Sequence, residues 1–324
     1  MPALVEKLQH ISEIARKGEF SITIDAEEVD RLEASLLIFE QLMLADTGQN
    51  WNGMGIVVQA YQKRAPAVLD RLIQLAKQTN KQIPIRLVKG AYWDTEIKRA
   101  EEMGLPDYPV FTQKHHTDLS YISCARQLLD AGECVFPKFA THNAHSAAAI
   151  LHMAGNSRAF EFQRLHGMGE ALHDILVQNH SAQCRIYAPI GRHKELLPYL
   201  VRRLLENGAN SSFVNQLMDS TLDIDSLVVD PISLTEQSAN SSHRPIKAPR
   251  DHLTEGRLAA SGLDWTQSDI STSLEEMAVS QSQIHASCLV DGEAQGGAAT
   301  DIRNPNNNTA VSYTHLTLPT NREV

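Results

Sequence analysis

Short runs of β-branched and aliphatic residues alternate with segments of helical spacing through the first two thirds of the chain. The predicted strands are Ser21–Asp25, Gly55–Tyr61, Ile83–Lys89, Val135–Thr141, Phe160–His166 and Cys184–Ala188. Helical patterns precede or follow them, as at Ala3–Arg16, Glu28–Leu44, Pro66–Lys77 and Lys194–Asn207. Strands that each lead into a helix predict an α/β fold with a parallel sheet and right-handed crossovers.

Polar residues near the carboxyl ends of these strands separate two architectures that share this pattern. In a βα barrel the carboxyl ends converge on one mouth, whereas an open doubly wound sheet gathers its ligand groups near one switch point. Every predicted strand has such a residue, which favours the barrel: Asp25, Gln59, Tyr61, Arg86, Lys89, His142, His166 and Tyr187.

A TIM-type (βα)8 barrel needs eight strands, and six are predicted here, so we expect an N-terminally truncated barrel whose first two strands lie upstream of Met1. The barrel is expected to cover residues 1–218. Serine-rich residues 219–300 are expected to form a linker and the start of an aldehyde dehydrogenase half, and 301–324 the edge of that second domain. Within it, 311–324 fit nothing before them and are interpreted as a non-native, adapter-derived tail.

Composition excludes several classes of protein. A net charge of −10 argues against a general nucleic-acid or anionic-membrane surface. No run approaches the roughly 20 apolar residues of a membrane span. The cysteines match no zinc or redox spacing and are expected to be thiols of a reducing cytoplasm (Cys124, Cys134, Cys184 and Cys288). The glycine-rich nucleotide-binding loops G-x-G-x-x-G and G-x-x-x-x-G-K-[ST] are absent from the sequence.

Two adjacent arginines lie on the last predicted helix. Arg202 and Arg203 share an arc with Glu206, opposite a face of leucines and Val201. This arc is either a solvated surface with an i,i+4 ion pair or a fork for a substrate carboxylate, which guanidinium groups bind bidentately.

The run Arg86–Trp93 ends a predicted strand with two cations, a glycine and two aromatic residues. Two cations at a strand end suit a site that stabilises developing negative charge, such as a reduced flavin or an enolate. Alternatively, Arg86 and Lys89 pair with Asp25 or Asp94. Lys89 at a barrel mouth also permits Schiff-base chemistry, and this makes an aldolase the rival enzyme.

Two further strand ends carry candidate polar groups. Asp25 is expected to orient Arg86 or to act as a base, because burying an unpaired carboxylate is costly. His142 and His145 have i,i+3 spacing, but no acidic or cysteine partner lies at ligand spacing, so no metal site is expected. Asn143 is an equally good helix N-cap.

Together these segments resemble the proline dehydrogenase barrel, and closely that of the bifunctional bacterial proline utilization flavoproteins. The ordered blocks that carry the resemblance are Ile24–Glu28, Val58–Arg64, Arg86–Asp94, Phe139–His145, Leu165–Glu170, Arg185–Pro189 and Tyr199–Asn207.

The resemblance implies FAD-dependent oxidation of L-proline to 1-pyrroline-5-carboxylate by hydride transfer to a non-covalently held flavin. Arg86 is then both a catalytic and a cofactor residue held by Asp25, beside the flavin edge that gains negative charge. The other implied cofactor contacts are Gln59, Val88, Lys89, Gly90, Ala91, Trp93, Thr141 and His142. The implied substrate residues are Arg202 and Arg203 at the carboxylate, Glu206 beside them, and Tyr187, Tyr92 and Leu165 around the pocket.

The resemblance also implies a quinone electron acceptor at the membrane, a cytoplasmic or peripheral inner-membrane location and a homodimer for the parent protein. NAD would serve only the aldehyde dehydrogenase half. DNA binding is not expected of this chain. The family's early-strand lysine, in a Lys-Leu-Ser-Ala-type run, is missing, and Cys288 is not the dehydrogenase nucleophile. A catalytically inactive fragment therefore remains an alternative.

In a longer protein with the complete barrel, Arg202→Ala or Arg203→Ala should raise the KM for proline strongly and leave the flavin content near that of the unchanged protein. Steady-state kinetics and the visible spectrum measure the two quantities. Unchanged proline kinetics in either variant would contradict the carboxylate fork.

Overall fold

The computed structural model describes residues 2–45, 51–208, 228–239, 246–252, 257, 259–279, 284–286, 288–295, 298–303, 308 and 310–316. In the helix that ends at Gly208, side chains are described as far as Val201. The chain divides into two compact units, Met1–Asp264 and Trp265–Val324.

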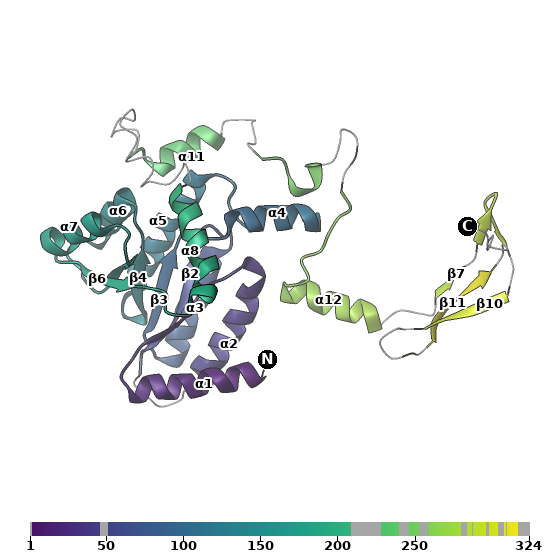
Figure 1. The fold of residues 1–324 in the computed structure, drawn as a ribbon, viewed down its shortest axis with the longest axis horizontal. Helices are drawn as coiled ribbons and strands as arrows, with labels where there is room; N and C mark the ends of the chain where they lie inside the picture. Colours follow the sequence, from purple (N-terminus) through teal and green to yellow (C-terminus); the bar gives the residue numbers. More distant parts are fainter. Residues whose placement is uncertain are drawn as a thin grey trace. The chain divides into compact units, whose positions relative to one another are not determined.

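The first unit is built on a six-stranded parallel sheet (Figure 1). Its strands follow each other in space as they do in sequence: β1 (Ile22–Ile24), β2 (Met54–Gln59), β3 (Ile83–Val88), β4 (Val135–Ala140), β5 (Glu161–Leu165) and β6 (Gln183–Tyr187). A doubly wound sheet reverses its strand order at a switch point, and this order has no reversal. The sheet is therefore a curled, partial (βα) barrel, which confirms the predicted fold class.

Helices connect and cover the strands. They are α1 (Pro2–Lys17), the 3-10 turn η1 (Val29–Arg31), α2 (Leu32–Ala45), α3 (Ala65–Thr79), α4 (Trp93–Met103), α5 (Lys114–Asp130), the 3-10 turn η2 (Gly132–Cys134), α6 (Ala144–Ala154), α7 (Glu170–His180) and α8 (His193–Gly208). The six predicted strands and the four named helical patterns are confirmed to within a few residues. Helix α4 and the loop after it form an extra segment between β3 and α5.

Alternate residues of each strand face opposite sides of the sheet. On β3 and β4, the side chains of Ile85, Leu87 and Phe139 lie in the apolar core with residues of α3 and α5. The residues between them, including Arg86 and Lys138, consequently face the lumen of the barrel. The period of two thus separates an apolar layer under the helices from a polar lumen.

The part of the first unit that follows α8 adds helical segments. Helix α11 (Pro231–Ala239) packs against α5, where the Oγ of Ser238 lies 3.1 Å from His115 Nε2 and 3.3 Å from His116 Nε2. A 3-10 turn, η3 (Pro249–His252), packs against α4. The predicted barrel end near Met218 lies outside the described residues, so that domain boundary stays a prediction.

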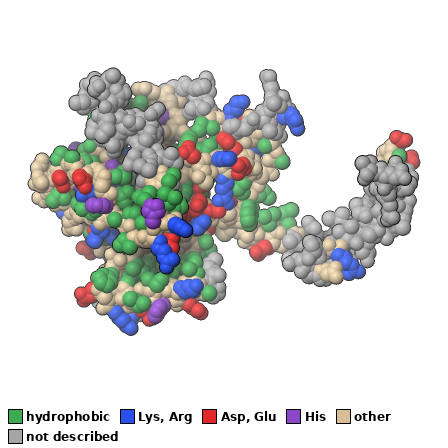
Figure 2. All heavy atoms as spheres, viewed as in Figure 1, with side chains coloured by type: hydrophobic (Ala, Val, Ile, Leu, Met, Phe, Trp, Pro, Cys, Tyr) green, Lys and Arg blue, Asp and Glu red, His purple; other side chains and the backbone are tan. Residues whose placement is uncertain are grey.

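The apolar face predicted for α8 is only partly covered. Leu197 is 50% exposed and Leu200 42% exposed. Figure 2 shows exposed apolar side chains on the side of the first unit where α8 lies.

The second unit contains α12 (Ser268–Val279) and two small sheets. One has the order β10-β11-β7, with β10 (Ala298–Arg303) antiparallel to β11 (Ala310–Leu316) and β11 parallel to β7 (Ile284–Ala286). The other pairs β8 (Cys288–Val290) with β9 (Glu293–Gln295). Strand β11 overlaps the predicted non-native tail, whose origin stays a prediction.

Among the described residues of both units, no helix is long and apolar enough to cross a membrane.

Phe139 is the most direct test of the core between sheet and helices. It is fully buried, with its ring centroid 5.5 Å from that of Phe160 and 6.3 Å from that of Phe162. Phe139→Ala should lower the free energy of unfolding by about 3–5 kcal/mol, measured by urea denaturation. Phe20→Ala is the matched control, because Phe20 is 68% exposed and its loss should change stability by less than about 0.5 kcal/mol. Equal losses in the two variants would contradict the placement of the core.

Candidate active site

Arg86 lies on the lumen side of β3 near the carboxyl end of the strand. Its side chain is 17% exposed, and its Nη1 lies 3.9 Å from Asp25 Oδ1 at the end of β1. The guanidinium also lies over the ring of Tyr187, with Cζ 5.3 Å from the centroid. Three strands therefore bring these predicted site residues together. Asp25 itself is 64% exposed. The sequence-based expectation that this carboxylate is buried is therefore wrong.

Lys89 is held by a residue that sequence reasoning missed. Its ammonium donates to Asp118 on α5, which Lys114 Nζ also contacts at 2.9 Å. Lys89 therefore pairs with neither Asp25 nor Asp94, which corrects that alternative for Lys89, whereas the alternative is confirmed for Arg86, which pairs with Asp25. Burial lowers the pKa of Lys89, and Asp118 opposes this shift. Burial acts to raise the pKa of Asp118, but Lys89 and Lys114 together hold it below its usual range.

Gly90 is packed against the ring of Tyr61. Its φ is +138°, and a Cβ added there would lie 2.5 Å from atoms of that ring. Tyr61 is 2% exposed, and its hydroxyl has no hydrogen-bond partner among the described residues. Burial raises the pKa of Tyr61 above its usual value. Only glycine fits this close approach of the chain to the ring, and the turn that follows β3 depends on it.

The turn after β1 is tied to the last residue of β2 and to the segment that follows β3. Gln59 Nε2 donates to the carbonyl of Glu27 at 2.7 Å, and the Tyr92 hydroxyl donates to the Glu27 carboxylate. Val88 continues the ladder, since its carbonyl accepts from Ala60 N at 2.8 Å.

Ala91 and Trp93 complete the predicted cofactor segment at the start of α4. Trp93 Nε1 donates to the Phe111 carbonyl at 2.8 Å, and the Trp93 side chain is 37% exposed. Its indole is therefore fixed at one edge and partly open to solvent. Ala91 is half-buried.

Thr141 and His142 follow β4 and join its end to β5. His142 Nε2 accepts from Leu165 N at 3.3 Å, and Thr141 Oγ1 accepts from Asn143 N at 3.1 Å. Asn143 caps α6 by accepting from Ser146 N at 3.0 Å, so the predicted N-cap is confirmed. Leu165 is buried, and the ring of His142 serves the junction between the two strands.

His173 is a second histidine behind this junction. It is 1% exposed; its Nε2 lies 3.0 Å from the Thr141 carbonyl and its Nδ1 3.1 Å from Cys184 Sγ. Burial lowers the pKa of His173, and the contact with Thr141 opposes the shift only in part. Within the described part of the chain, no three His, Cys, Asp or Glu side chains cluster so as to hold a metal ion.

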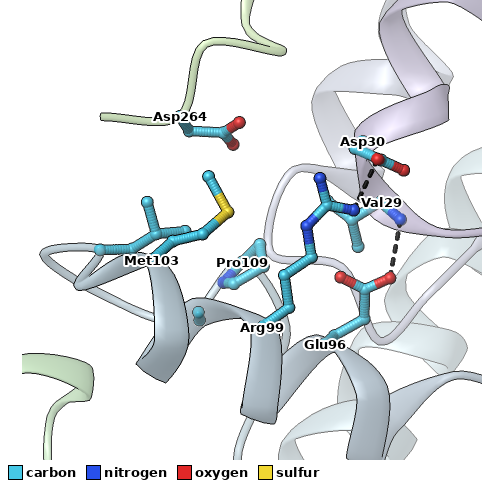
Figure 3. Close-up of a pocket in the computed structure, with 9 residues that line it drawn as sticks. Val29, Asp30, Glu96, Arg99, Met103, Pro109 and Asp264 are labelled. Carbon is cyan, nitrogen blue, oxygen red and sulfur yellow. Dashed lines mark hydrogen bonds and ion pairs between the residues drawn. The ribbon is translucent and has the colours of Figure 1, made fainter. Parts of the chain in front are cut away.

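A small hollow lies outside the mouth, between η1 and α4 (Figure 3). Glu96 of α4 accepts from Val29 N at 2.8 Å, and Arg99 forms an ion pair with Asp30 at 2.5 Å. Burial raises the pKa of Glu96. These contacts fasten η1, which follows Asp25, to α4, which begins at Trp93. The polar residues that line the hollow therefore hold two segments of the first unit together.

The predicted carboxylate fork is described only by its backbone. Arg202, Arg203 and Glu206 belong to α8, but their side chains lie outside the described residues. Their predicted contacts with substrate remain predictions.

Several groups that hold the mouth were not predicted as site residues. Asp118, Glu27 and Phe111 each contact a predicted site residue from another segment. The i,i+4 pair of Lys114 and Asp118 is visible in the sequence, but pairing with Lys89 depends on how α5 packs against β3.

Fold and site together define a (βα) barrel with a cationic mouth. The sequence pattern of the family "Proline dehydrogenase" matches residues 3–216. The chain belongs to the proline dehydrogenase family.

Relatives and solved structures agree with this assignment. The chain is 45% identical to the bifunctional protein PutA of Salmonella typhimurium, over 94% of this chain and 24% of that protein. It is 28% identical to proline dehydrogenase 1 of Bacillus subtilis, over 64% and 61% of the two chains. A crystal structure of bifunctional proline utilization A matches with a TM-score of 0.80 and 46% identity, over 85% of this chain and 28% of that one. The chain thus spans about a quarter of the length of its bifunctional relatives.

His173 gives a pH prediction. Since its pKa is lower in the folded chain than the value of about 6.5 in an unfolded chain, the unfolded chain binds more protons between the two values. The free energy of unfolding should therefore fall as the pH drops below about 6.5, by at most about 1.4 kcal/mol per pH unit from this group. His173→Gln should flatten the dependence, measured by urea denaturation between pH 7.5 and 5. The exposed His152→Gln is the control; an equal change in both would contradict the assignment.

Proposed function

We propose that the mouth of this barrel binds FAD non-covalently and oxidises L-proline to 1-pyrroline-5-carboxylate. The observation that carries the proposal is Arg86, a shielded cation at a strand end that contacts both Asp25 and Tyr187. A fixed positive charge in a partly dry site stabilises negative charge that develops during reaction. The family assignment gives the same substrate in its name.

The donor set at the mouth fits such a cofactor. Arg86 and Lys89 supply two cations, and Gly90 lets the main chain after β3 pass close to the ring of Tyr61. Trp93 offers an aromatic surface, and Gln59, Val88, Ala91, Thr141 and His142 complete the proposed contacts. FAD, when bound, supplies the acceptor for the hydride that leaves the proline ring carbon beside the nitrogen.

The residues of this chain bind and orient the substrate. Arg202 and Arg203 hold the proline carboxylate, and Glu206 steadies the two guanidinium groups. Tyr187, Tyr92 and Leu165 shape the pocket around the ring. Asp25 orients Arg86, so that its charge faces the ligand.

The comparison proteins give this proposal its context. One solved structure is titled as proline utilization A with proline bound in remote sites, and another, from Bdellovibrio bacteriovorus, as inactivated by N-propargylglycine. For the longer protein we propose a membrane quinone as electron acceptor, a homodimer and a cytoplasmic location with peripheral contact to the inner membrane. NAD belongs to the aldehyde dehydrogenase half.

The Schiff-base alternative has no support from the relatives described above, a bifunctional PutA protein and a proline dehydrogenase. Lys89 is also engaged by Asp118, and this contact occupies the amine that a Schiff base would need free.

The first test is the visible spectrum of the purified chain after incubation with FAD and removal of free flavin. Flavin bands that bleach on anaerobic addition of L-proline are the expected result, because bound flavin loses its absorbance when it takes up the hydride. D-proline is the control for stereochemistry. A colourless chain would contradict flavin binding, and bands that persist with L-proline would contradict the reaction. Borohydride trapping of substrate on Lys89 would favour the aldolase instead.

A further inference from the structure

Lys138 occupies the lumen at the same level as Arg86. The register pairs Arg86 of β3 with Lys138 of β4, and Lys138 with Glu161 of β5. Paired residues of neighbouring strands point to the same side of a sheet. Since Phe139 and Phe162, the next residues along, lie in the core under the helices, all three charged side chains face the lumen. Lys138 lies outside all the sequence blocks that carry the family resemblance, and the resemblance assigns it no function.

The carboxylate of Glu161, beside Lys138, already accepts hydrogen bonds from two other side chains. Glu161 accepts from Arg185 Nε at 2.9 Å and from Arg185 Nη2 at 2.9 Å, and Gln163 Nε2 donates to it at 2.6 Å. Lys138 Nζ lies 4.0 Å from Glu161 Oε1, at the outer limit of an ion pair. Within the described part of the chain, this is its one ion pair, and Glu161 is therefore shared between two cations.

The layer carries more positive than negative charge. Arg86 and Lys138 of this layer, together with Arg185 from the next level of β6, face Asp25 and Glu161, so one cation has no full counter-charge among these groups. Arg185 is 59% exposed and is screened by water, so the buried surplus lies at Lys138. The side chains of Lys138 and Glu161 are 7% and 4% exposed. A buried charge without a partner costs several kcal/mol. Burial lowers the pKa of Lys138, Glu161 opposes this, and Arg185 and Arg86 lower it further.

An anion placed above this layer would supply the missing charge. Lys138 also repels the guanidinium of Arg86, which is its neighbour in the ladder, and this repulsion favours the observed position of Arg86 towards Asp25 and Tyr187. The surplus positive charge therefore acts on the mouth in two ways. It affects the position of Arg86, and it makes the local electrostatic potential more positive.

We propose that Lys138 is a positioning residue of the mouth: from the neighbouring strand, at the same level, it directs Arg86 towards Asp25 and Tyr187 and makes the site favour the more negatively charged state of its ligand. This inference rests on the proposed function, in which that ligand is FAD and its more negative state is the reduced one. A cation retained in the lumen would thereby favour the product side of the oxidation.

The test compares the affinity of the whole chain for oxidised FAD with its affinity for dithionite-reduced FAD under anaerobic conditions. Lys138→Met should lower the ratio of the two affinities, reduced over oxidised, by about tenfold, which for a two-electron couple equals a potential about 30 mV lower. Lys138→Arg should keep the ratio within about threefold, because it conserves the charge. Lys17→Met is the matched control, since Lys17 is exposed at the end of α1, and it should leave the ratio unchanged.

A second variant guards against a Lys138→Met chain that fails to fold. Glu161→Gln removes negative charge from the same layer and should shift the ratio in the opposite direction, towards the reduced form. A folded Lys138→Met chain with an unchanged ratio, or a Glu161→Gln ratio that falls, would overturn the inference and leave flavin binding standing. If the unchanged chain binds FAD in neither state, the proposed function of this mouth is overturned, and the inference with it.

Discussion

The parallel register of β1 to β6 is the constraint on which the rest of the structure depends. Because side chains alternate along a strand, one register assigns every second residue to the core under the helices and the others to the lumen. Ile85, Leu87 and Phe139 fill the first layer. Arg86 and Lys138 enter the second as neighbours in the ladder. A shift of one residue would put these cations against the apolar faces of the helices, so packing of the core also fixes the charges of the lumen.

The charges at the mouth are held by partners from distant parts of the chain. Lys89 reaches Asp118 on α5, and Arg86 reaches Asp25 just after β1. The pair of Arg86 and Asp25 joins two βα units, whereas the pair of Lys89 and Asp118 ties the end of β3 to the helix of its own unit. The lumen layer differs, because Glu161 serves both Arg185 and Lys138. A ligand with negative charge is the natural complement of such a surface, in agreement with the chemistry of the family.

Much of the barrel could be predicted because its signals are local. The predicted strand Ile83–Lys89 is observed as Ile83–Val88, and Val135–Thr141 as Val135–Ala140. Asn143 could be predicted as an N-cap, since its side chain accepts a hydrogen bond within its own turn. The contact of Asp118 with Lys89 could not be predicted, because it spans 29 residues and depends on how α5 packs on β3. The exposure of Asp25 was misjudged for the same reason, since the solvent around a strand end depends on elements that the local pattern does not place.

The sequence by itself determined the succession of strands and helices, the apolar period and the family. These follow from short-range sterics and from residues at fixed spacing. Only the tertiary structure decided which charges meet: that Lys89 belongs to Asp118, that Gly90 lies on the ring of Tyr61, and that Lys138 shares Glu161 with Arg185. Ion pairs and close contacts depend on distances between segments, and those distances exist only once the strands are in register and the helices are packed.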